Sequence, residues 1–138
     1  MIDRKKIGKA NRSAGKRFEL KVRSDLEEKG WIVFRNGNDV TPVEQIDIGE
    51  YARFFRQARP KWNPATRSPM MMQSGYPDFI CIFNRGSYFD VQFVECKVNG
   101  ILSREEKDKN EWIKAELNIP VYIASRGKKR GTIEYILV

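Results

Sequence analysis

Apolar residues recur every four positions along the first part of the chain, from Ala14 to Leu26. This is the spacing at which side chains share one face of an α-helix. Gly30 follows as a stop signal, so the pattern predicts a helix over residues 13–29. The preceding residues 1–12 are basic and lack an apolar stripe, and we expect them to form a mobile arm.

A second helix is predicted over residues 102–117. Ser103 and Glu106 have the spacing of a capping box at its start, and Trp112 and Leu117 supply part of an apolar face. Short apolar runs separated by turn residues predict strands elsewhere. These runs are residues 31–35, the two arms of 75–98, and residues 120–126 and 132–138.

Residues 38–75 form an insert that begins in the turn sequence at 36–39. Within the insert, aromatic residues at helical spacing predict a helix over 49–58, and the three prolines after it predict a long loop. Cations of the insert and of the turn at 128–130 are DNA-contact candidates, although a solvated surface would explain them as well. They are Arg53, Arg56, Arg59, Lys61, Arg67, Lys128, Lys129 and Arg130. The methionines 70–72 indicate either adaptable packing or a partner-binding surface.

The element order predicts an α/β fold with a central mixed sheet and helices on both faces. That order is helix, strand, insert, strand, strand, helix, strand, strand, and residues 13–138 are expected to form one domain. The chain has 26 Lys and Arg against 18 Asp and Glu, a net charge of +8, so nucleic acid is the expected partner. We find neither a bilayer-spanning apolar run nor a secretory signal, and we expect a cytoplasmic protein, nucleoid-associated or viral.

Histidine is absent, which excludes Ser-His-Asp and Cys-His catalysis and histidine-ligated zinc. The two cysteines, Cys81 and Cys96, lie in apolar runs without a CxxC partner, so we interpret them as small apolar residues. Catalysis by this chain must therefore rely on carboxylates, lysine and a bound cation.

The predicted hairpin at 75–98 places three charged residues together. A two-residue turn at Gly86-Ser87 pairs positions whose numbers sum to 173, which sets Asp78 opposite Glu95. Lys97 shares the face of Glu95 because strand side chains alternate. Two neighbouring carboxylates repel each other unless a cation lies between them, and oxygen ligands favour Mg²⁺, with Mn²⁺ as a substitute.

The same residues predict a hydrolytic site. The backbone carbonyl of Cys96 would add a third oxygen ligand, and the metal would polarise a phosphoryl oxygen. Lys97 would orient or deprotonate the attacking water, its pKa lowered by the cation. The alternative is an exposed strand end on which Glu95 and Lys97 form a weak surface ion pair.

Pro77-Asp78 followed by Glu95-Cys96-Lys97 resembles the PD-(D/E)xK signature of the restriction-endonuclease-like nucleases. Residues 15–35 resemble the opening of archaeal Holliday junction resolvases, and residues 74–126 resemble the VRR-NUC branch. The resemblance implies that Glu19, on the first helix, is a supporting acid and metal ligand, unless it is a solvent-facing glutamate. It also implies a homodimer that acts in DNA recombination or repair. Glu106 occupies the place of a glutamine in many relatives, but the capping box explains it better.

The resulting prediction is a Mg²⁺-dependent endonuclease that acts on branched DNA. A flap or duplex nuclease of the VRR-NUC kind and a non-catalytic DNA-binding module on the same fold remain alternatives. So does an interaction protein that binds another protein through the basic arm and the methionines.

Overall fold

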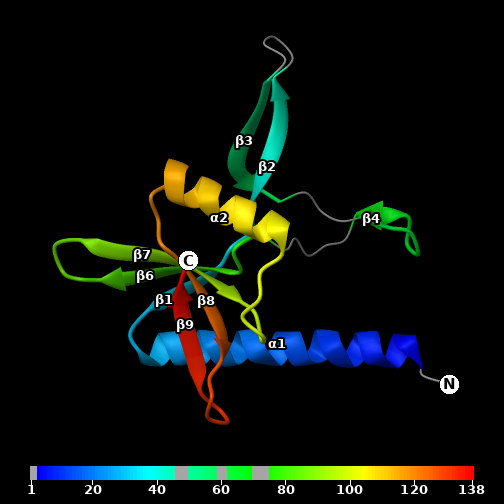
Figure 1. The fold of residues 1–138 in the computed structure, drawn as a ribbon, viewed down its shortest axis with the longest axis horizontal. Helices are drawn as coiled ribbons and strands as arrows, with labels where there is room; N and C mark the ends of the chain where they lie inside the picture. Colours follow the sequence, from blue (N-terminus) through cyan, green and yellow to red (C-terminus); the bar gives the residue numbers. More distant parts are fainter. Residues whose placement is uncertain (1–2, 46–49, 59–61, 70–74) are drawn as a thin grey trace.

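The structure is a computed structural model that describes residues 3–45, 50–58, 62–69 and 75–138. These residues form an α/β protein with two helices and a five-stranded mixed sheet, in the order α-β-β-β-β-β-β-β-α-β-β (Figure 1). The predicted class and mixed sheet are confirmed. The order differs from the prediction because the insert itself contains strands.

The sheet brings together strands from both halves of the chain. β7 and β8 are parallel, and every other neighbouring pair is antiparallel. A parallel pair needs a long crossover, and α2 lies in that connection. Across the sheet the strands are β1 (Ile32–Arg35), β6 (Phe79–Asn84), β7 (Phe89–Cys96), β8 (Val121–Arg126) and β9 (Ile133–Leu137).

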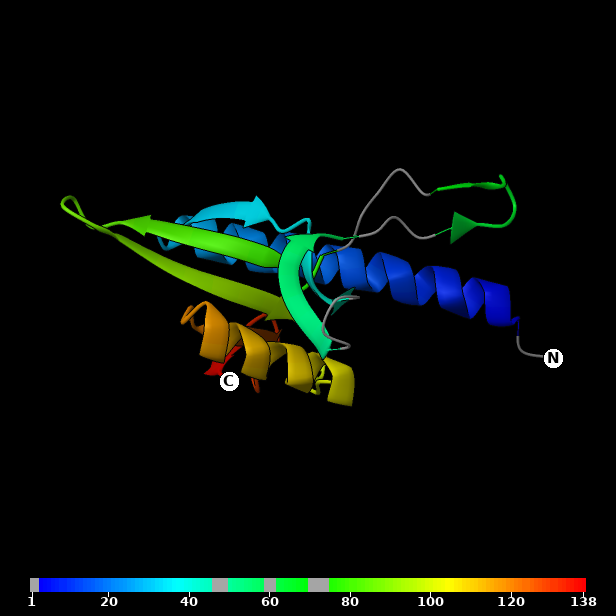
Figure 2. The same ribbon diagram turned by 90° about the horizontal axis from the view of Figure 1, so that it is seen from above.

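Helix α1 (Arg4–Glu28) packs on one face of the sheet through Phe18, Val22 and Leu26. It begins nine residues before the predicted helix, so the prediction of a mobile arm is wrong for residues 4–12. The side chain of Asp3 caps this helix by accepting hydrogen bonds from the backbone N–H groups of the second and third helical residues. The apolar stripe is missing there because the amino-terminal part of α1 extends beyond the sheet (Figure 2).

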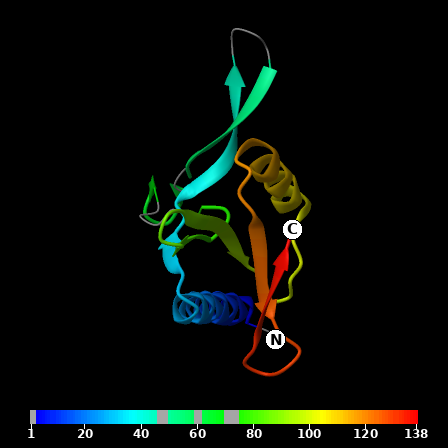
Figure 3. The same cartoon turned by 90° about the vertical axis from the view of Figure 1, so that its left-hand side faces the viewer.

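Helix α2 (Arg104–Glu116) covers the opposite face, where Ile113 packs with Phe93 and Val121 (Figure 3). The predicted capping box is present: Ser103 Oγ accepts from Glu106 N, and Glu106 Oε1 accepts from Ser103 N. Side chains of β7 alternate between the two helices, since Phe93 faces α2 and Val94 faces α1. The prediction of helices on both faces is therefore confirmed.

The insert is a β-ribbon, so the helix predicted over residues 49–58 is wrong. β2 (Asn38–Gln45) pairs with β3 (Glu50–Gln57) in an antiparallel ribbon that projects from the sheet (Figure 1). The aromatic residues that suggested a helical stripe also favour strands, and a short apolar run does not distinguish the two. The predicted loop carries two further short strands, β4 (Trp62–Asn63) and β5 (Ser68–Pro69).

Backbone hydrogen bonds close the insert at its base. Gly37 O accepts from Ala58 N at 2.8 Å, and Asn38 O accepts from Tyr76 N at 2.9 Å. A Cβ atom at Gly75 would collide with the backbone of Asn36 and Asn38, so this close approach requires glycine. The insert thus enters and leaves the core at one point and leaves the main sheet intact.

Two further sequence expectations concern the cysteines and the bilayer. Cys81 is fully buried in the cluster under α1, Cys96 packs at its edge, and both are free thiols, as the reading of small apolar residues requires. Among the described residues, no helix combines the length and the apolar character that crossing a bilayer needs.

Candidate active site

The hairpin formed by β6 and β7 has the predicted register. Phe79 pairs with Val94 and Asn84 pairs with Phe89, and both pairs sum to 173. Gly86 has a positive φ of 93°, and Arg85 N donates to Tyr88 O at 2.9 Å across the two-residue turn. The register therefore brings Asp78, which directly precedes β6, next to Glu95 near the end of β7.

Each of these two acids accepts a hydrogen bond from the backbone of the opposite strand. Asp78 N donates to Glu95 Oε2 at 3.0 Å, and Cys96 N donates to Asp78 Oδ2 at 2.8 Å. Glu95 is only 6% exposed, and Asp78 is half-buried. These bonds fix both carboxyl groups and occupy one oxygen of each.

Burial raises the pKa of both carboxyl groups. For Glu95 the negative charge of Asp78 adds to the effect of burial, and its pKa rises to about 9. For Asp78 burial outweighs the hydrogen bonds and the charge of Lys97, which lower its pKa. A cation bound between two such carboxyl groups offsets their repulsion, and oxygen ligands favour a hard divalent ion. The donor set of Asp78 and Glu95 therefore fits Mg²⁺.

Lys97 lies beside the acids, as predicted, but its main partner is a third carboxylate. Its Nζ is 2.7 Å from Glu106 Oε2 and 4.0 Å from Glu95 Oε1. Burial lowers the pKa of Lys97, but the hydrogen bond and the charge of Glu106 outweigh this and raise it. These surroundings favour the charged ammonium, whereas the lowering of the Lys97 pKa expected from a bound cation stays a prediction.

Glu106 has a role that the sequence prediction missed. One of its oxygens accepts from Ser103 N in the capping box, and the other binds Lys97. The cap fixes the side chain at the start of α2, from where it reaches across to the end of β7. The capping-box spacing found Glu106, but nothing in the sequence placed α2 above Lys97.

Glu19 lies near the pair on helix α1 and is half-buried. Burial raises its pKa, and the charge of Asp78 raises it further, while Arg35 and Lys16 lower it. Among the residues that the structure describes, no three Asp, Glu, Cys or His side chains form a group that could hold a metal ion. The structure thus brings Asp78, Glu95 and Lys97 together and leaves Glu19 at the margin.

Asn36 is a second residue that sequence analysis missed. It is 1% exposed, its Nδ2 donates to Pro77 O at 2.7 Å, and its backbone N donates to Asp78 O at 2.9 Å. These bonds hold the segment that carries Asp78 against the end of β1. An Asn-Gly pair after a strand indicates a turn and gives no sign of this positioning role.

The DNA-contact candidates fall into two groups. Lys129 and Arg130 line a cavity of about 500 Å³ between α1 and the β8–β9 turn, together with Arg17, Lys21 and Arg126, and Lys128 lies in the same turn. The described lining includes no acidic residue. Arg53 and Arg56 lie on β3 and Arg67 lies in the turn between β4 and β5, while Arg59, Lys61 and the methionines 70–72 lie outside the described residues.

Comparisons with known proteins do not assign the chain to a family. No family model matches the chain, and no curated protein or solved structure shows significant similarity to it.

Proposed function

We propose that the protein is a Mg²⁺-dependent endonuclease that hydrolyses phosphodiester bonds in DNA. The observation that carries this proposal is the buried pair Asp78 and Glu95, fixed by backbone hydrogen bonds next to a charged lysine. The antiparallel strands β1, β6 and β7 followed by α2 and the parallel β8 are what a restriction-endonuclease-like core would require. The resemblance of the Pro77-Asp78 and Glu95-Cys96-Lys97 motifs to that superfamily supports the same reading.

Each residue of the site has a distinct role in this proposal. Asp78 and Glu95, with the carbonyl of Cys96, would hold Mg²⁺, which supplies Lewis-acid activation of the phosphoryl group and of water. Lys97 is charged, so it would bind a phosphate oxygen and stabilise the negative charge that develops during attack. Glu106 keeps the ammonium of Lys97 at the end of β7. Glu19, on helix α1 near the pair, would be a supporting acid.

Cations outside the site support DNA as the substrate. Arg17, Lys21 and Arg126 line one cavity with the turn residues Lys129 and Arg130, and phosphate groups are the ligands such a surface favours. The turn follows β8, whose Arg126 N donates to Val98 O at 3.2 Å, next to Lys97. The cationic cavity and the acid pair therefore lie at the same end of the sheet.

A homodimer is part of the proposal, since cutting two strands needs two sites. An uncovered part of the sheet supports it. Ile32, Ile82 and Val91 lie in one row across β1, β6 and β7, and Ile32 is 51% exposed. Apolar rows of this kind favour association. Sedimentation of the protein should give a dimer, and replacing Ile32 by Glu should give a monomer.

A non-catalytic DNA-binding module is the second candidate. It is favoured because, among the described residues, no three Asp, Glu, Cys or His side chains are placed to hold one metal ion together. Incubation of the protein with junction, flap, duplex and single-stranded DNA, in Mg²⁺ and in EDTA, separates the candidates. The proposal expects cleavage in Mg²⁺ alone, with branched DNA cut fastest. Binding without cleavage of any substrate would favour the module, and equal cleavage of all four would remove the preference for branched DNA.

A further inference from the structure

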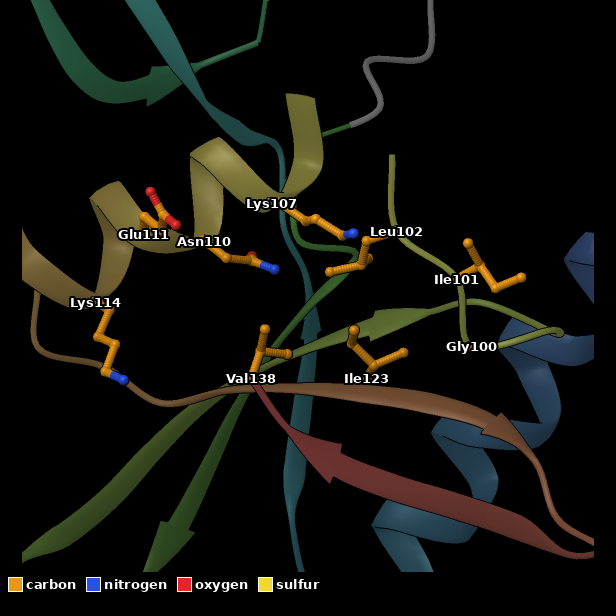
Figure 4. A pocket seen from close by; sticks show the side chains of 9 residues that line it. All are labelled: Gly100, Ile101, Leu102, Lys107, Asn110, Glu111, Lys114, Ile123 and Val138. Carbon is orange, nitrogen blue, oxygen red and sulfur yellow. The ribbon is translucent and has the colours of Figure 1, made fainter. Parts of the chain in front are cut away.

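A second cavity, of about 600 Å³, lies between α2, the loop after β7 and the strands β8 and β9 (Figure 4). Ile101, Leu102, Ile123 and Val138 give it apolar walls. Its volume is within the range of about 300–1,000 Å³ that small-ligand sites occupy. Neither the acid pair nor the cationic cavity uses any of these residues.

Asn110 contributes a buried hydrogen-bond donor to the wall of this cavity. The residue is 5% exposed, and its Oδ1 accepts from Tyr76 Oη at 2.9 Å. Its Nδ2 has no hydrogen-bond partner among the residues that the structure describes. Figure 4 shows this nitrogen directed into the space between Leu102 and Val138. Buried amide groups are almost always paired, so the cavity calls for a ligand that carries an acceptor.

The mouth of the cavity adds positive charge. Lys107 and Lys114 both line it from α2, and both are exposed. Residues seven apart are two turns apart on the same helix face, so the two ammonium groups flank the opening. Glu111, between them, reduces the net charge of this rim but leaves it positive. A ligand that matches this cavity has apolar surface, a hydrogen-bond acceptor and negative charge near the mouth.

We propose that the cavity takes one unpaired base of the bound nucleic-acid strand. A base has apolar faces and acceptor atoms at its edge, and these become available to a protein pocket when the base is unpaired. The edge would accept from Asn110 Nδ2, and the adjoining phosphates would bind Lys107 and Lys114. This inference rests on the proposed function in taking nucleic acid as the ligand.

The cavity adjoins the candidate active site. Its loop residues, Gly100 to Leu102, follow Lys97 within five positions, and Tyr76, the partner of Asn110, lies two residues before Asp78. A base held here belongs to a nucleotide close to the phosphate that is cut. The pocket would therefore favour strands with an unpaired base at the cut, such as branched or single-stranded DNA, over a regular duplex.

The test compares two labelled 20-nucleotide strands in EDTA by fluorescence anisotropy: oligothymidylate, and a fully abasic strand with the same phosphates. The full chain should bind oligothymidylate about tenfold more tightly. Asn110→Asp replaces the donor by an acceptor and keeps the acceptor for Tyr76. Ile101→Trp fills the mouth from a position that is 68% exposed. Both variants should lose the preference and keep the affinity for the abasic strand, whereas Phe89→Trp, at the tip of the β6–β7 hairpin, should keep both.

Each other outcome contradicts a defined part of the account. An unchanged preference in both cavity variants would overturn the base pocket, even if Mg²⁺-dependent cleavage is found. Displacement of the strand by millimolar dAMP, together with equal affinity for the two strands, would assign the cavity to a free nucleotide and overturn it as well. If the protein binds neither strand nor any other DNA, the proposed function fails together with this inference.

Discussion

At the tip of the β6–β7 hairpin, Arg85 and Asp90 form an ion pair 2.7 Å long with side chains that are 45% and 42% exposed. At its base, Asp78 and Glu95 lie together, and Glu95 is almost fully buried. The same hairpin thus holds an ion pair exposed to water at its tip and a pair of carboxyl groups shielded from water at its base. At the tip water solvates the charges, and such pairs contribute little to stability. At the base two carboxyl groups are desolvated, which makes ionising both of them costly and raises the pKa of each, and a role in binding a cation would account for that cost.

The largest expected effect is the loss of cleavage when an acid at the base is neutralised. Asp78→Asn should reduce the rate of Mg²⁺-dependent cleavage at least about 100-fold, because the site loses half of its carboxylate ligands. Asp90→Asn removes the same charge from the tip and should leave the rate unchanged. The rate of cutting a labelled junction measures both. Similar rates for the two variants would mean that the base of the hairpin is not the catalytic site.

The next effect concerns Glu106, which holds Lys97 without touching the substrate. Glu106→Gln keeps a hydrogen-bond acceptor for Ser103 but removes the charge, so kcat should fall about 10- to 100-fold with little change in KM. Ser103→Ala removes the cap and should lower stability by about 1 kcal/mol with a smaller effect on kcat.

A double variant tests whether Glu106 acts through Lys97. If it does, Glu106→Gln combined with Lys97→Ala should be no slower than Lys97→Ala alone. Fully additive losses would show that Glu106 acts independently of the lysine.

A smaller effect is expected on folding stability. Asn36→Ala leaves the buried carbonyl of Pro77 without its donor, which should lower the free energy of unfolding by about 2 kcal/mol. Asn84→Ala removes an exposed hydrogen bond to Gly86 at the tip and should cost under about 0.5 kcal/mol. Urea unfolding measures both, and equal losses would contradict the contrast between base and tip.

The smallest effect concerns a carboxylate that has partners. Asp25 Oδ2 accepts from Tyr135 Oη at 2.6 Å and binds Lys29 Nζ at 2.8 Å. Burial raises the pKa of Asp25, but these partners outweigh it and hold the pKa below its usual value. Its stabilising contribution is therefore present above the unfolded-state pKa and is lost as the pH falls through the folded-state pKa. Asp25→Asn should lower stability by about 1 kcal/mol at pH 7. In acid this difference should disappear, and an equal loss by urea unfolding at both pH values would contradict the assignment.

Local signals in the sequence sufficed for the hairpin. Gly86 fixes the turn, the turn fixes the register, and the register places Asp78 beside Glu95. The capping box likewise located α2. These features depend on residues near one another in the chain, and their physics is local.

The rest depended on contacts between distant segments. Residues 49–58 were predicted as a helix because β3 was considered without its partner β2, and pairing between strands decides such cases. The ion pair of Lys97 with Glu106 and the hydrogen bonds of Asn36 exist because α2 and the start of β6 pack where they do. Sequence spacing contains no signal for either.

The central claim is that Asp78 and Glu95 hold a divalent cation, and calorimetric titration with Mn²⁺ in the absence of DNA tests it most directly. The account predicts saturable binding to the unmodified protein and to Asp90→Asn, and none to Asp78→Asn. Titrations that show no binding to the unmodified protein, or equal binding to all three proteins, would contradict it.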